Sequence, residues 1–129
     1  TLFRSARVVL AARTESRLKE LAAEVDAAGG TSLVVPTDIT DEEQRRALVD
    51  AAVAEFGRVD CLINNAFGIP PMDPITTLDL DGLRAAQETN VFAPLRLSAL
   101  FADALAWIGD GSHWGGPGGI AENGSFWSF

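Results

Sequence analysis

The stretch GRVDCLINNA, residues 57–66, carries the clearest fold signal in the chain. Its central part, Val59–Ile63, is a short and mainly apolar run, which is typical of a strand buried in a parallel sheet. Gly57 stops the helical pattern that precedes this run, and two asparagines close it. We therefore predict a helix, a buried strand and a polar turn in direct succession.

The same alternation comes before this stretch. Val8–Ala12 and Ser32–Val35 are short apolar runs that predict two further buried strands. A helical pattern extends from Leu18 to Val25, and a second runs from Thr40 to Phe56 and opens with a Thr-x-x-Glu sequence that predicts a capping box. Strands that alternate with amphipathic helices predict βαβ units with right-handed crossovers and a parallel sheet.

A long helix is predicted after a proline-containing loop over residues 68–74. It runs from about Leu80 to about Ala106 and contains Asn90 and, four residues later, Pro94. Proline cannot donate a hydrogen bond to the carbonyl four residues before it, and its ring crowds that carbonyl. We therefore expect a kink in the helix at this place and a free Asn90 carbonyl that can hold a water molecule.

Composition excludes several classes of protein. The net charge of −8 argues against general nucleic-acid binding, and no apolar run is long enough to cross a membrane. Cys61 is the only cysteine, which favours a cytoplasmic location. His113 is the only histidine and has no cluster of cysteines or carboxylates near it in the sequence, so no metal site is predicted.

Four motifs, in this order and spacing, carry a family resemblance: Val8–Arg13, Thr37–Thr40, Gly57–Ala66 and Thr89–Val91. Together they resemble the short-chain dehydrogenase/reductase family of NAD(P)-dependent oxidoreductases. The resemblance covers roughly residues 6–105 and implies an α/β fold, a Rossmann-type doubly wound parallel sheet. It also implies that the three predicted strands are the second to fourth of the family sheet, so that the sheet is incomplete.

The resemblance places the adenosine half of the cofactor at the ends of the first two strands. Arg13 occupies the position that reads the adenosine ribose, where an arginine would pair with a 2′-phosphate, so NADP(H) is favoured over NAD(H). Asp38 would accept a hydrogen bond from the adenine amino group, and the backbone N–H of Ile39 would meet the ring. The residues alone leave open that Arg13 is an exposed arginine at a helix start and that Asp38 is a turn residue.

Two further parts of the site follow from the resemblance. Asn64, Asn65 and Ala66 would pass beside the cofactor ribose, although Phe67 stands where family members usually have glycine. Asn90 would be the catalytic asparagine, whose carbonyl holds a water in the proton relay to a catalytic lysine. The alternative for Asn90 is a surface asparagine beside a tolerated proline kink.

The chemistry of the family is hydride transfer between NADP(H) or NAD(H) and a carbonyl or alcohol substrate. It uses a tyrosine, a lysine four residues later and a serine. The chain has no tyrosine, and its one lysine, Lys19, lies far upstream. We therefore expect a fragment that is inactive by itself, from a parent enzyme that forms a homo-oligomer and acts on a small molecule. The alternative is a non-catalytic module that binds a dinucleotide or a protein partner.

Three segments are expected. Residues 1–5 fit no element of the family and are interpreted as a non-native start. Residues 6–106 form the partial NAD(P)-binding domain. Residues 107–129 are rich in glycine and tryptophan without periodicity, which predicts a disordered or frame-shifted tail.

Overall fold

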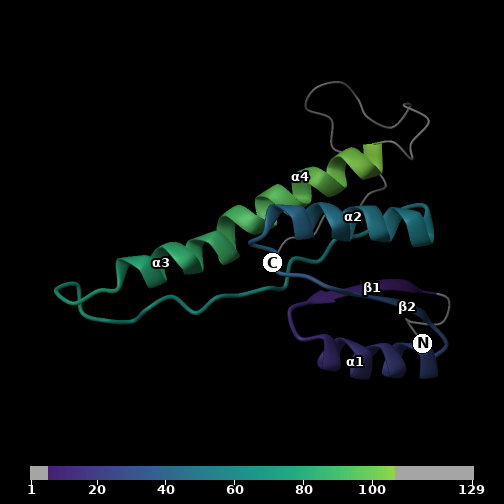
Figure 1. The fold of residues 1–129 in the computed structure, drawn as a ribbon, viewed down its shortest axis with the longest axis horizontal. Coiled ribbons are helices and arrows are strands. Elements are labelled where there is room, and N and C mark those ends of the chain that lie inside the picture. The colour runs from purple at the N-terminus through teal and green to yellow at the C-terminus, as the bar shows by residue number, and fades with distance from the viewer. Residues whose placement is uncertain (1–5, 107–129) are drawn as a thin grey trace.

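The computed structural model describes residues 6–106, so the expectations for residues 1–5 and 107–129 lie outside the described residues. Within that range the chain alternates strands and helices and ends in a long helical rod (Figure 1). The elements, in chain order, are β1 (Arg7–Ala12), α1 (Glu15–Ala27), β2 (Thr31–Pro36), α2 (Glu42–Phe56), α3 (Leu80–Gln87), the π-helical turn η1 (Glu88–Phe92) and α4 (Ala93–Ala106).

The sheet of the described part consists of β1 and β2, which pair in parallel from Arg7 opposite Thr31 to Ala12 opposite Pro36. Helix α1 lies on one face of the sheet, and α2 with α4 lies on the other (Figure 1). The arrangement confirms an α/β fold with a partial parallel sheet and a helical layer on each side.

The core lies between α2, α4 and the sheet. Apolar residues of α2 recur every three or four positions, so they form one face, and this face meets the apolar side of α4. Partly buried side chains from both strands and from the segment after α2 pack against it, among them Val9, Val35 and Val59. The buried members of this cluster are Leu48, Val49, Ala52, Leu97 and Phe101.

The predicted third strand is wrong for the described structure. Val59–Ile63 forms no strand, and only Ile63 makes an isolated bridge. A parallel strand needs a neighbour for its hydrogen bonds, and in the doubly wound order the neighbour of this segment would be a strand that residues 6–106 do not contain. The segment keeps its apolar contacts instead, since Val59 and Leu62 pack against the core.

The same absence of a neighbouring strand among the described residues explains why the two strands that do form are incompletely buried. Full burial on both faces was expected, but Val8, Val9 and Leu10 are only half-buried, and Ala11 and Ala12 are exposed. A two-stranded sheet has two open edges, so neither strand can be enclosed as a central strand would be.

The start of α2 also differs from the prediction. The N-cap residue is Asp41, whose carboxylate accepts a hydrogen bond from the backbone N–H of Gln44 at 2.9 Å. Thr40 does not cap the helix, because its hydroxyl donates to Asp38 at 2.7 Å. Aspartate caps helices as well as threonine does, so the sequence offered two neighbouring caps, and the turn before the helix engages the threonine.

We expect a polypeptide of these 129 residues, made alone, to show no cooperative unfolding transition. Large apolar side chains of the segment between α2 and α3 face solvent, including Ile69 at 83% and Met72 at 89% exposed. A two-stranded sheet with open edges is marginal by itself, and each buried backbone group without a partner costs about 1–3 kcal/mol. Thermal unfolding followed by near-ultraviolet circular dichroism tests this, and a sharp two-state melt would contradict it.

Candidate functional site

The candidate site starts at the carboxyl ends of β1 and β2. These strands are parallel, so the residues that follow them, Arg13 after β1 and Asp38 after β2, leave the sheet at the same edge. The pKa of Asp38 is held below its usual range, mainly by hydrogen bonds from Thr40 and to a smaller extent by the positive charge of Arg13. The structure therefore brings Arg13 and Asp38 into one electrostatic neighbourhood.

The turn Asp38–Thr40 is held by its own side chains. One carboxylate oxygen of Asp38 accepts from the backbone N–H of Thr40 at 2.9 Å and from its hydroxyl at 2.7 Å. The backbone N–H of Asp38 donates to the side chain of Gln44 at 2.7 Å. The Asp38 carboxylate is thus charged and fixed in direction, in agreement with its predicted place in a turn before α2.

These hydrogen bonds predict a pH-dependent effect of Thr40→Val. The pKa of Asp38 is lower in the folded state, so its stabilising contribution is present above the unfolded pKa of about 3.9 and is lost as the pH falls through the folded pKa. Thr40→Val removes the hydroxyl donor, so it should destabilise the full-length protein at pH 7 and less so near pH 3. Urea unfolding at both pH values measures this.

Thr40→Ser is the matched control, because it keeps the hydroxyl and should behave as the parent at both pH values. A Thr40→Val penalty that is equal at the two pH values would mean that the hydroxyl does not act through the charge of Asp38.

The second part of the site is the segment from Asn64 to Gly68. The connection between α2 and α3 runs alongside the helical rod (Figure 1), and this segment is hydrogen-bonded to the rod at two points, Ser98 of α4 and Asn90 of η1. The Asn64 side chain donates to the Ser98 hydroxyl at 3.2 Å, whereas Asn65, Ala66 and Phe67 are exposed. Asn64 therefore braces the segment against α4, and the next three residues face outwards.

Asn90 makes the second attachment with both ends of its side-chain amide. Its oxygen accepts from the backbone N–H of Gly68 at 2.7 Å, and its nitrogen donates to the Gly68 carbonyl at 2.8 Å. A side chain added at Gly68 would meet Thr89 at 3.4 Å, so the segment runs close to the helix. The prediction considered only the backbone carbonyl of Asn90, and it missed both this paired contact and Gly68.

The backbone around Asn90 departs from the α-helix as a π turn. The N–H of Ala93 donates to the carbonyl of Glu88, five residues earlier, within η1 (Glu88–Phe92). Pro94 removes the donor that the Asn90 carbonyl would otherwise have, which is the reason for expecting an interruption at this place. The interruption takes the form of a π turn, a feature that occurs often at functional sites.

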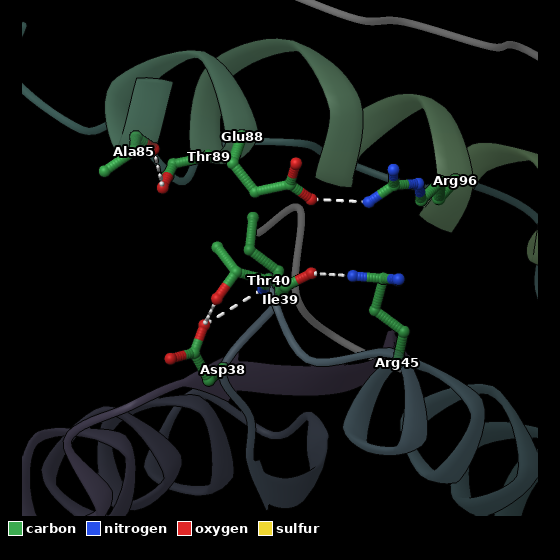
Figure 2. Close-up of polar contacts among 8 residues, drawn as sticks. All are labelled: Asp38, Ile39, Thr40, Arg45, Ala85, Glu88, Thr89 and Arg96. Atoms are coloured by element: carbon green, nitrogen blue, oxygen red, sulfur yellow. Dashed lines mark hydrogen bonds and ion pairs between the residues drawn. The ribbon is translucent and has the colours of Figure 1, made fainter. Parts of the chain in front are cut away.

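One buried residue of this region escaped the sequence analysis. Arg45 in the first turns of α2 is 2% exposed, and it donates to the Ile39 carbonyl at 2.6 Å (Figure 2). Glu88 of η1 and Arg96 of α4 form an ion pair at 2.5 Å. This pair lies on the opposite side of the turn Asp38–Thr40 from Arg45 (Figure 2). The sequence does contain a signal for the burial of Arg45. Arg45 precedes Leu48 and Val49 by three and four residues, so it lies on the apolar face of the helix.

Residues 6–106 contain neither a cluster of metal-ligating side chains nor a membrane-spanning helix. No group of three or more histidine, cysteine, aspartate or glutamate side chains there could hold a metal ion. No helix in the same range has both the length and the apolar character needed to span a bilayer.

Comparison with known proteins assigns the family. The family model for short chain dehydrogenases matches residues 2–115. The short chain dehydrogenase/reductase dpchG of Colletotrichum higginsianum is 36% identical over 93 residues, which are 72% of this chain and 35% of that protein. The chain belongs to the short-chain dehydrogenase/reductase family, and it spans about a third of the length of the curated relatives it matches.

Solved structures agree with this assignment. A metagenomic short-chain oxidoreductase in complex with NADP has a TM-score of 0.71 and 33% identity, with 78% of this chain and 45% of that chain covered. A 7α-hydroxysteroid dehydrogenase in complex with NADH and 7-oxo glycochenodeoxycholic acid has a TM-score of 0.71 and 34% identity, with 77% and 38% covered. These matches confirm the Rossmann-type fold and the family of oxidoreductases.

Proposed function

We propose that the protein to which this chain belongs is an NADP(H)-dependent oxidoreductase that acts on a carbonyl or alcohol group of a small molecule. The observation that carries the proposal is the common position of Arg13 and Asp38 at the carboxyl ends of two parallel strands. Nucleotides bind to doubly wound sheets at this edge.

The residues present fit the adenosine half of NADP(H). Arg13 is exposed and forms no ion pair with the residues that the structure describes, so its guanidinium is available to a 2′-phosphate. No acidic residue ends β1, where one would accept hydrogen bonds from a free ribose hydroxyl. The two solved relatives contain NADP in one case and NADH in the other, so the preference for NADP(H) rests on Arg13 itself.

Each remaining site residue receives a proposed role. Asp38 accepts a hydrogen bond from the adenine amino group, and the Ile39 N–H meets the ring. Asn64, Asn65 and Ala66 lie beside the ribose.

The nicotinamide supplies or accepts the hydride when the cofactor is bound. Asn90 is the proposed catalytic residue, whose backbone carbonyl holds a water in the proton relay. This role is supported by the π turn, since Pro94 leaves the Asn90 carbonyl without the donor of a regular helix.

The family uses a tyrosine for proton transfer to the substrate, and these 129 residues contain none. We assign this step to residues of the full-length protein that are not among them. We therefore propose that the chain alone is inactive.

A cytoplasmic location and a homo-oligomer are part of the same proposal, and neither nucleic acid nor membrane is a proposed partner. The proposed homo-oligomer is supported by three apolar side chains that are exposed on η1 and α4, namely Val91, Phe92 and Leu95. Another copy of the protein could cover them.

The test is turnover by the full-length protein, followed as NADPH oxidation with a panel of ketones and aldehydes. Turnover with NADPH and little with NADH supports the proposal. Binding of NADPH without turnover of any carbonyl or alcohol would favour the alternative, a non-catalytic dinucleotide-binding module. No binding of either nucleotide would refute both and leave a protein-interaction module.

A further inference from the structure

Arg45 is a buried cation whose environment does not resemble that of a stabilising ion pair. Its guanidinium donates to one backbone carbonyl, that of Ile39 at 2.6 Å, and its Nε is buried with no hydrogen-bond partner among the described residues. No carboxylate of the described chain forms an ion pair with it. Glu88, which lies across the turn, is paired with Arg96 (Figure 2).

Burial of this guanidinium carries an energetic cost. A buried charge loses its hydration, and a single neutral acceptor does not fully replace it. Replacement of buried charged groups by apolar side chains of similar volume is often neutral or stabilising. The position on the apolar face of α2, in line with Leu48, Val49 and Ala52, is one where an apolar residue would pack well. Stabilisation of the fold therefore does not explain the presence of an arginine at position 45, and a role in function is the better explanation.

The Ile39 carbonyl that Arg45 holds belongs to the turn Asp38–Thr40. Gln44 fixes the backbone N–H of Asp38, and the Asp38 carboxylate fixes the N–H of Thr40. The bond from Arg45 is the contact that ties the middle of the turn to α2. Ile39 packs at the same time against the core cluster that contains Leu97, so the turn is held between α2 and α4.

We propose that Arg45 is a positioning residue for cofactor binding. By holding the Ile39 carbonyl, it keeps the turn Asp38–Thr40 in the orientation in which Asp38 and Ile39 receive the adenine. This inference rests on the proposed function of the turn and adds to it a residue that does not touch the cofactor. This role needs the hydrogen-bond donors of the arginine side chain. An apolar side chain of similar length should therefore fill the space without positioning the turn.

The experiment compares the full-length protein with its Arg45→Met and Arg45→Lys variants. Affinity for NADPH and for 2′,5′-ADP, which contains the adenine half alone, is measured by calorimetry, and stability is measured by urea unfolding. Arg45→Met should weaken both affinities about tenfold, the order expected for one charged hydrogen bond. Its unfolding midpoint should be unchanged or higher. Arg45→Lys keeps a donor and should recover most of the affinity.

Steady-state kinetics give a second, independent result. Because the turn is assigned to binding alone, Arg45→Met should raise the KM for NADPH about tenfold and leave kcat at saturating NADPH within about twofold. A residue that merely supports the fold would lower the unfolding midpoint and the apparent kcat, and it would leave the KM for NADPH of the folded fraction unchanged.

Each contrary outcome has one meaning. Unchanged affinity in Arg45→Met, or a variant that unfolds or fails to fold, overturns the positioning role and leaves the proposed function intact. A parent protein that binds neither NADPH nor 2′,5′-ADP overturns the proposed function, and the positioning role with it.

Discussion

Arg13→Ala in the full-length protein should weaken NADPH binding by about tenfold to a hundredfold and change NADH binding by less than about threefold. The charged hydrogen bonds of an arginine to a phosphate are worth about 1.5–3 kcal/mol, and NADH has no 2′-phosphate to lose them. Arg13 is exposed at the end of β1, so the substitution removes little packing. Titration of nucleotide fluorescence with both cofactors measures the two affinities.

Arg17→Ala is the matched control for this experiment. Arg17 lies four residues further along the chain, in α1, and is also exposed, and its removal makes the same change in net charge. It should leave both affinities nearly unchanged. Equal losses of NADPH and NADH affinity in Arg13→Ala, or equal effects of the two substitutions, would show that Arg13 does not read a 2′-phosphate.

Asn90→Asp should lower both stability and turnover, although it changes a single group. The side-chain nitrogen that donates to the Gly68 carbonyl becomes a carboxylate oxygen, so a hydrogen bond is replaced by a repulsive contact. The expected loss is about 1–3 kcal/mol of unfolding free energy at pH 7. We expect kcat to fall by about tenfold to a hundredfold, because the segment from Asn64 to Gly68 loses its position.

The pH dependence of this variant provides a sharper check. When the introduced carboxyl is protonated, its O–H can donate to the Gly68 carbonyl while its other oxygen accepts from the Gly68 N–H. The stability difference from the parent should therefore shrink as the pH is lowered from 7 towards 4. Gln87→Glu makes the same amide-to-carboxylate change at an exposed neighbouring position and should cost little. A penalty for Asn90→Asp no larger than that of Gln87→Glu would contradict the paired contact.

The sequence predicted the fold class because its signals are local. The apolar runs at Val8–Ala12 and Ser32–Val35, with helical patterns between and after them, correspond to β1, α1, β2 and α2. The interruption of the long helix was also predictable, because a missing proline N–H acts on a carbonyl only four residues away. The family followed from the order of the motifs, and the comparisons confirm it.

Other features depended on partners that a local pattern does not reveal. Val59–Ile63 has the composition of a strand, yet a strand forms only where a neighbouring backbone offers hydrogen bonds, and the described part of the chain lacks that neighbour. The choice of Asp41 over Thr40 as the cap of α2 was made by the Asp38 turn, which engages the Thr40 hydroxyl.

The amino-acid sequence by itself thus determined the alternation of strands and helices, the parallel class of sheet and the position of the break at Asn90. Tertiary structure alone decided that the Asn90 side chain binds Gly68, 22 positions away in the chain, and that the guanidinium of Arg45 is buried against Ile39. The physical reason is range. Periodicity and proline chemistry act within a few residues, whereas these contacts require packed elements that place distant backbone groups within hydrogen-bonding distance.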